Sequence, residues 1–168
     1  VCIMAIRFNA DEVFQIAERM EQNAASYYHT AAEKVQYPGA RQMFLDLASW
    51  EEKHERAFAQ LHSQLSKKAK DEVTFDPYDE AGQYLESLAD ESVFVTAQSP
   101  LEKIGQEPSF AEILRFAIGK EKDSIAFYTG IKKMVPKDFG ENEVEKIIEE
   151  EMTHVTTLTG QLKKVGSE

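Results

Sequence analysis

A set of four residue types occurs twice in the chain, with the two copies one hundred positions apart: Glu21, Tyr28, Glu51 and His54, then Glu121, Tyr128, Glu151 and His154. The neighbouring residues keep the same register, because residues 17–28 (AERMEQNAASYY) align without a gap on residues 117–128 (AIGKEKDSIAFY). The repeat therefore predicts that the two halves of the chain fold as two copies of one structural unit.

Each copy has the pattern of an antiparallel pair of helices. Apolar residues return every three or four positions, which is typical of amphipathic helices. Asn9 and Ser109 each stand three residues before a glutamate, a combination that marks helix N-termini. Tyr37-Pro38-Gly39 and Val135-Pro136 break the pattern. We expect four helices, over residues 9–36, 38–65, 109–135 and 139–165.

The fold expected from these helices is all-α and forms a single domain over residues 1–168. Short connections make two helical hairpins of residues 9–66 and 109–166. Residues 67–108 contain three prolines and a short amphipathic stretch, and we expect a long crossover with one short helix there. Two hairpins joined by one long crossover are the connectivity of ferritin-like four-helix bundles.

The repeated glutamates and histidines have the spacing of metal ligands. Glu51 and His54 lie on one face of a helix about one turn apart, so both can reach the same ion. The tight hairpin lets Glu21 face this pair, and the second hairpin repeats the arrangement. Two divalent ions such as Fe²⁺ would balance the four buried carboxylates, which otherwise have to take up protons. Oxygen and imidazole ligands suit iron or manganese, and zinc could also bind.

The two repeated tyrosines are candidate catalytic residues. Tyr28 lies two helical turns after Glu21 on the same stripe, so we expect it near that carboxylate, and Tyr128 is its counterpart. Each tyrosine could donate a hydrogen bond to a ligand, protect the site as an electron donor, or only fill the core.

Other polar residues have weaker claims on the site. His29 and His62 follow no Glu-x-x pattern, and surface or packing roles are expected for them. Glu18 is a minor alternative ligand, and Trp50 fits a core or an interface equally well. Tyr27 has Phe127 as its counterpart in the other copy, which favours core packing for both. The glutamates that flank the repeated motifs are expected to be solvated: Glu52, Glu55, Glu149 and Glu150.

Composition excludes several classes of function. A net charge of -11 and a pI near 4.9 argue against binding to nucleic acid or to an anionic membrane. Cys2 is the one cysteine, so no disulfide or cysteine-ligated iron site forms within these residues. The N-terminal apolar run is too short for a signal peptide, and no run has transmembrane length, so a cytoplasmic location is expected.

The chain resembles the rubrerythrin-type branch of the ferritin-like di-iron carboxylate proteins over both hairpins. The resemblance implies that Glu21 and Glu121 are the single carboxylates, one of them bridging. It also implies that the two Glu-x-x-His pairs complete two iron sites. Rubrerythrins have a rubredoxin-like domain with cysteine ligands, which this sequence lacks. They commonly have a carboxylate where this chain has Ser124.

The resemblance also implies a function: an oxidoreductase that reduces hydrogen peroxide or dioxygen as Fe²⁺ is oxidised. Such an enzyme would need an external redox partner protein, and we expect a homodimer. Two alternatives stay open, a ferritin-like ferroxidase that handles iron and a non-catalytic stress protein whose metals are structural.

Overall fold

The computed structural model describes residues 10–36, 38–68, 108–135 and 140–165. These residues form four helices: α1 (Ala10–Lys34), α2 (Pro38–Lys68), α4 (Phe110–Met134) and α5 (Glu141–Val165). The all-α fold is confirmed, and α4 begins and ends one hundred residues after α1. The predicted cap Asn9 and the predicted crossover helix lie outside the described residues.

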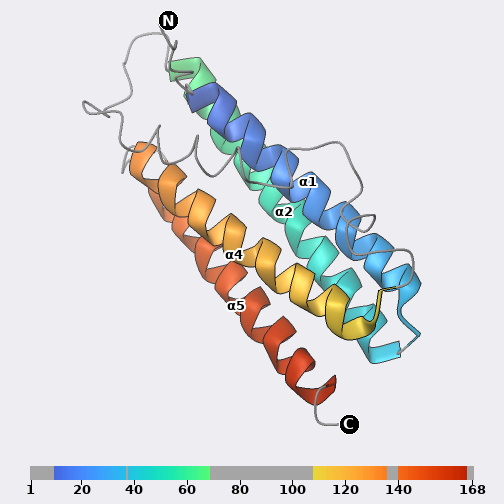
Figure 1. Ribbon diagram of the computed structural model, residues 1–168. Coiled ribbons are helices and arrows are strands. Elements are labelled where there is room, and N and C mark those ends of the chain that lie inside the picture. The colour runs from blue at the N-terminus through green and yellow to red at the C-terminus, as the bar shows by residue number, and fades with distance from the viewer. Residues whose placement is uncertain (1–9, 37, 69–107, 136–139, 166–168) are drawn as a thin grey trace, which may run out of the picture.

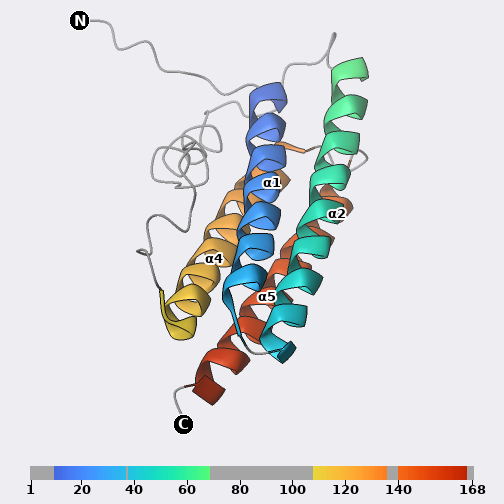
Figure 2. The same ribbon diagram turned by 90° about the vertical axis from the view of Figure 1, so that its right-hand side faces the viewer.

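The four helices form two antiparallel hairpins that lie side by side (Figures 1 and 2). α1 pairs closely with α2, and α4 with α5, while α1 meets α4 and α2 meets α5 more loosely. α2 ends at the opposite end of the bundle from the start of α4, as the colours in Figure 1 show. A helix of 25 residues is roughly 37 Å long, so the end of α2 and the start of α4 lie about a helix length apart.

Local sequence fixes the helix ends. The Ser109 hydroxyl accepts a hydrogen bond from the Glu112 amide, and the Glu112 carboxylate accepts one from the Ser109 amide at 2.8 Å. This is the predicted capping box, and it satisfies backbone donors that the first turn leaves free. At the other end of α4, Val135 is extended, as expected for a residue before proline. α2 runs to Lys68, slightly further than its apolar pattern predicts.

The core consists of two apolar clusters, one toward each end of the bundle. The first cluster combines the start of α1 and the end of α4 with residues of α2 and α5, including Phe14, Met20, Phe58, Tyr128 and Ile147. The second combines the end of α1 and the start of α4 with residues of α2 and α5, including Tyr28, Phe44, Leu47, Leu114 and Leu158. Equivalent positions of the two copies lie in different clusters, since Tyr28 belongs to the second cluster and Tyr128 to the first.

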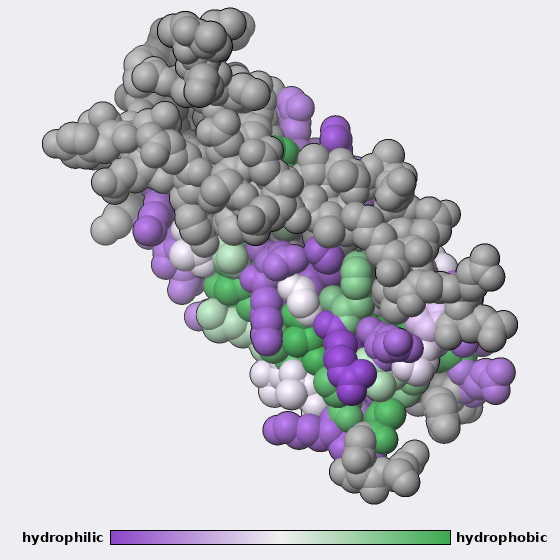
Figure 3. Space-filling view, in the orientation of Figure 1, coloured by the Kyte–Doolittle hydropathy of each residue, from purple (hydrophilic) through white to green (hydrophobic). Residues whose placement is uncertain are grey.

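The surface has both hydrophobic and hydrophilic areas. On the face drawn in Figure 3, a green band of hydrophobic side chains runs through the coloured area, with purple hydrophilic side chains on either side. Within the described ranges, no helix is both long and apolar enough to cross a membrane.

Gly140 is the one described glycine with a positive φ angle, at 130°. Its carbonyl accepts the first hydrogen bond of α5, from Val144, and a Cβ atom here would clash with the buried side chain of Leu61. Only glycine suits this combination of backbone angle and close approach.

We therefore expect Gly140→Ala to lower the free energy of unfolding by about 1–3 kcal/mol. Thermal and urea denaturation of the metal-loaded protein measure this. Gly119→Ala and Gly160→Ala are the controls, because both positions are in helices with open space around them. Each should stabilise the protein by up to about 1 kcal/mol. Equal effects at all three positions would contradict the role of Gly140.

Candidate metal centre

The structure brings the six predicted ligands together midway along the bundle, in a polar layer between the two apolar clusters. α1 and α4 each contribute one glutamate, and α2 and α5 each contribute a Glu-x-x-His pair. All six side chains are at most 5% exposed: Glu21, Glu51, His54, Glu121, Glu151 and His154. Six ionisable groups therefore share one interior site that is almost entirely shielded from bulk water.

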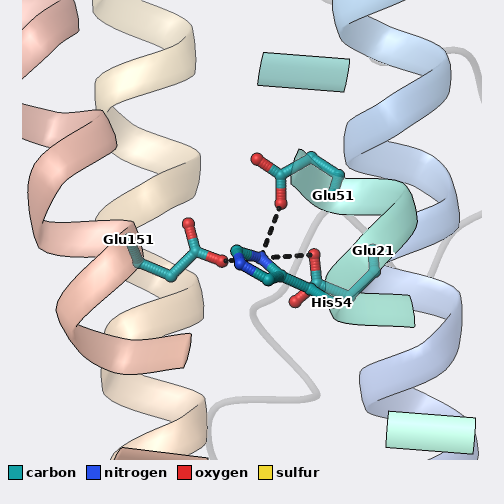
Figure 4. A group of neighbouring side chains, drawn as sticks. All are labelled: Glu21, Glu51, His54 and Glu151. Atoms are coloured by element: carbon teal, nitrogen blue, oxygen red, sulfur yellow. Dashed lines mark ion pairs between the residues drawn. The ribbon is translucent and has the colours of Figure 1, made fainter. Parts of the chain in front are cut away.

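His54 directs its Nδ1 atom at three carboxylates from three helices (Figure 4). Nδ1 lies 3.0 Å from Glu151 Oε1, 3.4 Å from Glu51 Oε2 and 3.9 Å from Glu21 Oε2. Ligand atoms about 2.1 Å from one ion and at right angles are about 3 Å apart, so these separations suit a single metal ion.

His154 repeats this geometry on the other side. Its Nδ1 atom lies 3.0 Å from Glu151 Oε2, 3.2 Å from Glu51 Oε1 and 3.7 Å from Glu121 Oε2. The two groups thus have the same inventory of three glutamates and one histidine, and the ligand atoms in each lie within 4.8 Å of one another.

Glu51 and Glu151 belong to both groups, with one oxygen directed at each histidine. The bridging position that the family resemblance gave to Glu21 or Glu121 therefore does not match the geometry. The reason is the packing of the two hairpins, since the Glu-x-x-His helices bring their own glutamates to the centre of the site.

Three buried atoms in the site have no hydrogen-bond partner: Glu51 Oε1, His54 Nδ1 and Glu151 Oε1. His54 Nε2 is 2.8 Å from the Glu150 carboxylate, so in the neutral form of the imidazole the proton lies on Nε2 and the lone pair on Nδ1. That lone pair then faces carboxylate oxygens, which are also acceptors. Buried unsatisfied acceptors are rare and costly, and a cation between them satisfies all of them. The residues present therefore fit a pair of metal ions.

The ionisation of the site shows the same demand for positive charge. Burial raises the pKa of Glu21 and of Glu151 well above the usual range, and the Glu51 charge adds to both shifts. Burial alone would lower the pKa of the histidines, but the surrounding carboxylates raise it to about 9 for His54 and about 12 for His154. Burial would raise the pKa of Glu51, but the positive charge of the two protonated histidines close to its oxygens lowers it to about 2. Without a cation, protons balance the site at neutral pH.

Metal binding should therefore release protons. Both histidine pKa values lie above 7, so at pH 7 each histidine has to lose a proton before its Nδ1 can bind a metal. The apparent affinity for a divalent ion should rise with pH between pH 6 and 8. Calorimetric titration in buffers of different ionisation enthalpy should give at least two protons released per protein. An affinity that does not change with pH would contradict this account.

The two repeated tyrosines cross from one hairpin to the other. The Tyr28 hydroxyl donates to Glu121, and the Tyr128 hydroxyl donates to Glu21. Each tyrosine therefore donates to a ligand carboxylate, which is one of the roles that the sequence allows, but that carboxylate belongs to the other hairpin and not to its own helix. Burial raises the pKa of both tyrosines, and the carboxylates beside them add to the shift, so both remain protonated donors. Each hydrogen bond ties the two hairpins together at a ligand.

Tyr28→Phe and Tyr128→Phe should each weaken metal binding by about 10-fold or more, because a ligand carboxylate loses the donor that orients it. Competition titration with a chromophoric chelator measures this. Tyr27→Phe is the matched control, since the Tyr27 hydroxyl is buried but donates to the Ile113 carbonyl at 2.8 Å. That variant should lose about 1 kcal/mol of stability and keep its metal affinity.

Several residues outside the six ligands have defined positions. Glu18 pairs with His62 at 2.7 Å, so the alternative ligand points away from the site. His29 is exposed and pairs with Glu52, and Glu55 accepts from Gln22.

Glu150 has a contact that the sequence does not predict. Its side chain is 42% exposed, in line with the expectation that it is solvated, but its carboxylate also binds His54 across the interface between α2 and α5. Its counterpart one hundred positions earlier is Trp50, which is 39% exposed, with its ring near both histidines. The mismatch between positions 50 and 150 was visible in the sequence, but only the packing of the hairpins shows what it faces.

Comparisons with known proteins agree with this geometry. The sequence model of the family described as rubrerythrin matches residues 12–162, which include nearly all of both hairpins and the six predicted ligands. The crystal structure of a candidate ferritin-like diiron-carboxylate protein from Thermotoga maritima is similar to the chain, with a TM-score of 0.71 and 25% sequence identity. That match covers 95% of this chain and 97% of the other. No curated protein matches the sequence.

Proposed function

This chain belongs to the rubrerythrin family, and from that premise we propose that it is a di-iron oxidoreductase that reduces hydrogen peroxide or dioxygen. The observation that supports the proposal most is the pair of matched ligand groups, which share Glu51 and Glu151. Two carboxylates shared between two groups suit two adjacent ions better than one.

The charge of the site favours two divalent ions. Two Fe²⁺ ions balance four carboxylates, and the neutral imidazoles complete the ligand set. When bound, two Fe²⁺ ions supply the two electrons that, with two protons, convert hydrogen peroxide into two molecules of water. Manganese or zinc would fit the same oxygen and nitrogen ligands, so metal analysis has to accompany the assay.

The protein side chains prepare the site for this chemistry. Tyr28 and Tyr128 hold the carboxylates of Glu121 and Glu21 in place from the two apolar clusters. These clusters exclude bulk water from both ends of the site. The tyrosine hydroxyls also are the nearest protein donors to these two carboxylates, so they are placed to hold protons there.

A cavity of about 260 Å³ between α2 and α5 supports access by a small substrate. His154 and Trp50 form part of its wall, together with Met43, Leu47 and Thr153. Hydrogen peroxide and dioxygen are far smaller than this cavity. We propose that they approach the centre from this side.

The proposal predicts that anaerobic protein loaded with two Fe²⁺ consumes one hydrogen peroxide per two iron ions. Mössbauer spectroscopy counts the Fe³⁺ formed, and a colorimetric assay follows the peroxide. Glu51→Ala and Glu151→Ala should lose both metal ions, whereas Glu52→Ala, at an exposed neighbouring position, should keep metal and activity. Peroxide that persists beside fully loaded Fe²⁺ protein would refute the redox function.

The same preparation distinguishes the alternatives. Faster oxidation by dioxygen than by peroxide, with soluble ferric iron accumulating beyond two ions per chain, would indicate an iron-handling ferroxidase. Repeated turnover with an added electron-donor protein would support the oxidoreductase. Size-exclusion chromatography tests the proposed homodimer, since iron storage needs a much larger assembly.

A further inference from the structure

The two halves of the metal centre match in every ligand but differ at positions 50 and 150, whose side chains lie against the ligand histidines. Positions 21, 28, 51 and 54 have the same residues as positions 121, 128, 151 and 154. Position 50, directly before the first Glu-x-x-His pair, is Trp50, and position 150 is Glu150. The two metal positions therefore have the same ligands but different surroundings.

Glu150 contacts the histidine of the other hairpin. Its Oε2 atom accepts a hydrogen bond from His54 Nε2 at 2.8 Å, while His54 Nδ1 faces the ligand carboxylates. A carboxylate on the outer nitrogen fixes the tautomer and ring orientation of a metal-bound histidine and increases its donor strength. The metal position beside His54 has such an outer carboxylate, that of Glu150.

Trp50 cannot give the same support to His154. Its ring lies edge-on at 6.4 Å from the His154 ring, and an indole has one N–H donor and no acceptor for an imidazole N–H. Every ion pair described for His154 uses Nδ1, and no described residue places a carboxylate on its Nε2 atom. His154 also lines the cavity between α2 and α5, which leaves its side of the site more open.

We propose that Glu150 makes the two metal positions unequal, so that a divalent ion binds more tightly beside His54 than beside His154. The inference rests on the proposed function only in that the site binds two metal ions. The inner ligands are the same in number and kind, so the difference comes from Glu150 and Trp50. Loss of such an outer carboxylate typically weakens metal binding 10–100-fold, and we expect a difference of about that size between the two positions.

Anaerobic titration with Co²⁺, followed by calorimetry and by its visible absorption, tests this on the full chain. The wild type should bind two ions in two resolved steps. Glu150→Gln should weaken the first step and bring the two affinities within roughly 3-fold of each other. Glu149→Gln, the same change at the exposed neighbouring position, should leave both steps as they are.

The position of the first ion gives a readout independent of affinity. Crystals of the wild type grown with one equivalent of Co²⁺ should show a stronger anomalous difference peak beside His54 than beside His154. Trp50→Glu places a carboxylate at the matching position of the other half, and should tighten the second step while the first is unchanged.

The outcomes separate this inference from the proposed function. Two ions bound with equal affinity in the wild type, or a first ion beside His154, would overturn the inference and leave the di-iron site intact. Equal effects of Glu149→Gln and Glu150→Gln would overturn it as well, since a general loss of charge would then explain both. A chain that binds no Co²⁺ would overturn the inference and the proposed function together.

Discussion

Four carboxylates lie in the interior of this helical bundle, and they need positive charge beside them to be stable there. Much of the remaining structure depends on this requirement. A buried, unpaired carboxylate is far less stable than one in water, so the polar layer is tolerable only with protons or metal ions in it. The apolar clusters on either side supply the burial that holds the helices together. They also keep water out of the layer, and so sharpen the preference for cations. The buried carboxylates therefore lower the stability of the metal-free protein, whereas bound metal ions raise the stability of the loaded protein.

The same requirement explains how the hairpins are joined. Backbone contact between the hairpins is looser than within them, so side chains bridge the interface. Tyr28 reaches Glu121 from one cluster, Tyr128 reaches Glu21 from the other, and Glu51 and Glu151 each face both histidines. An ion held by ligands from three helices adds the strongest of these links. The metal centre is therefore also the place where the two copies of the repeat are held in register.

The sequence predicts what depends on spacing along one helix, and little of what depends on the angle between helices. Glu51 and His54 share a face because helix geometry fixes residues three apart, so the ligand pairs follow from the sequence. The partner of Tyr28 does not follow, because the same stripe could approach its own Glu21 or the other hairpin. The contact of Glu150 with His54 does not follow for a related reason: Glu150 lies off the ligand stripe of its own helix, and only the packing of α5 on α2 brings it to His54.

The unequal surroundings of the two histidines bear directly on which function this centre performs. A peroxidase needs both ions to stay bound through oxidation and reduction, since both electrons come from the pair. A ferroxidase that passes iron on needs at least one position from which the ion leaves. His154 has no carboxylate behind it among the described residues and lines the cavity, so its ion is the one placed to exchange. If that weaker position still holds Fe²⁺ far below cellular iron levels, the centre suits catalysis. If it releases iron readily, the presence of Trp50 where the other copy has Glu150 favours iron handling instead.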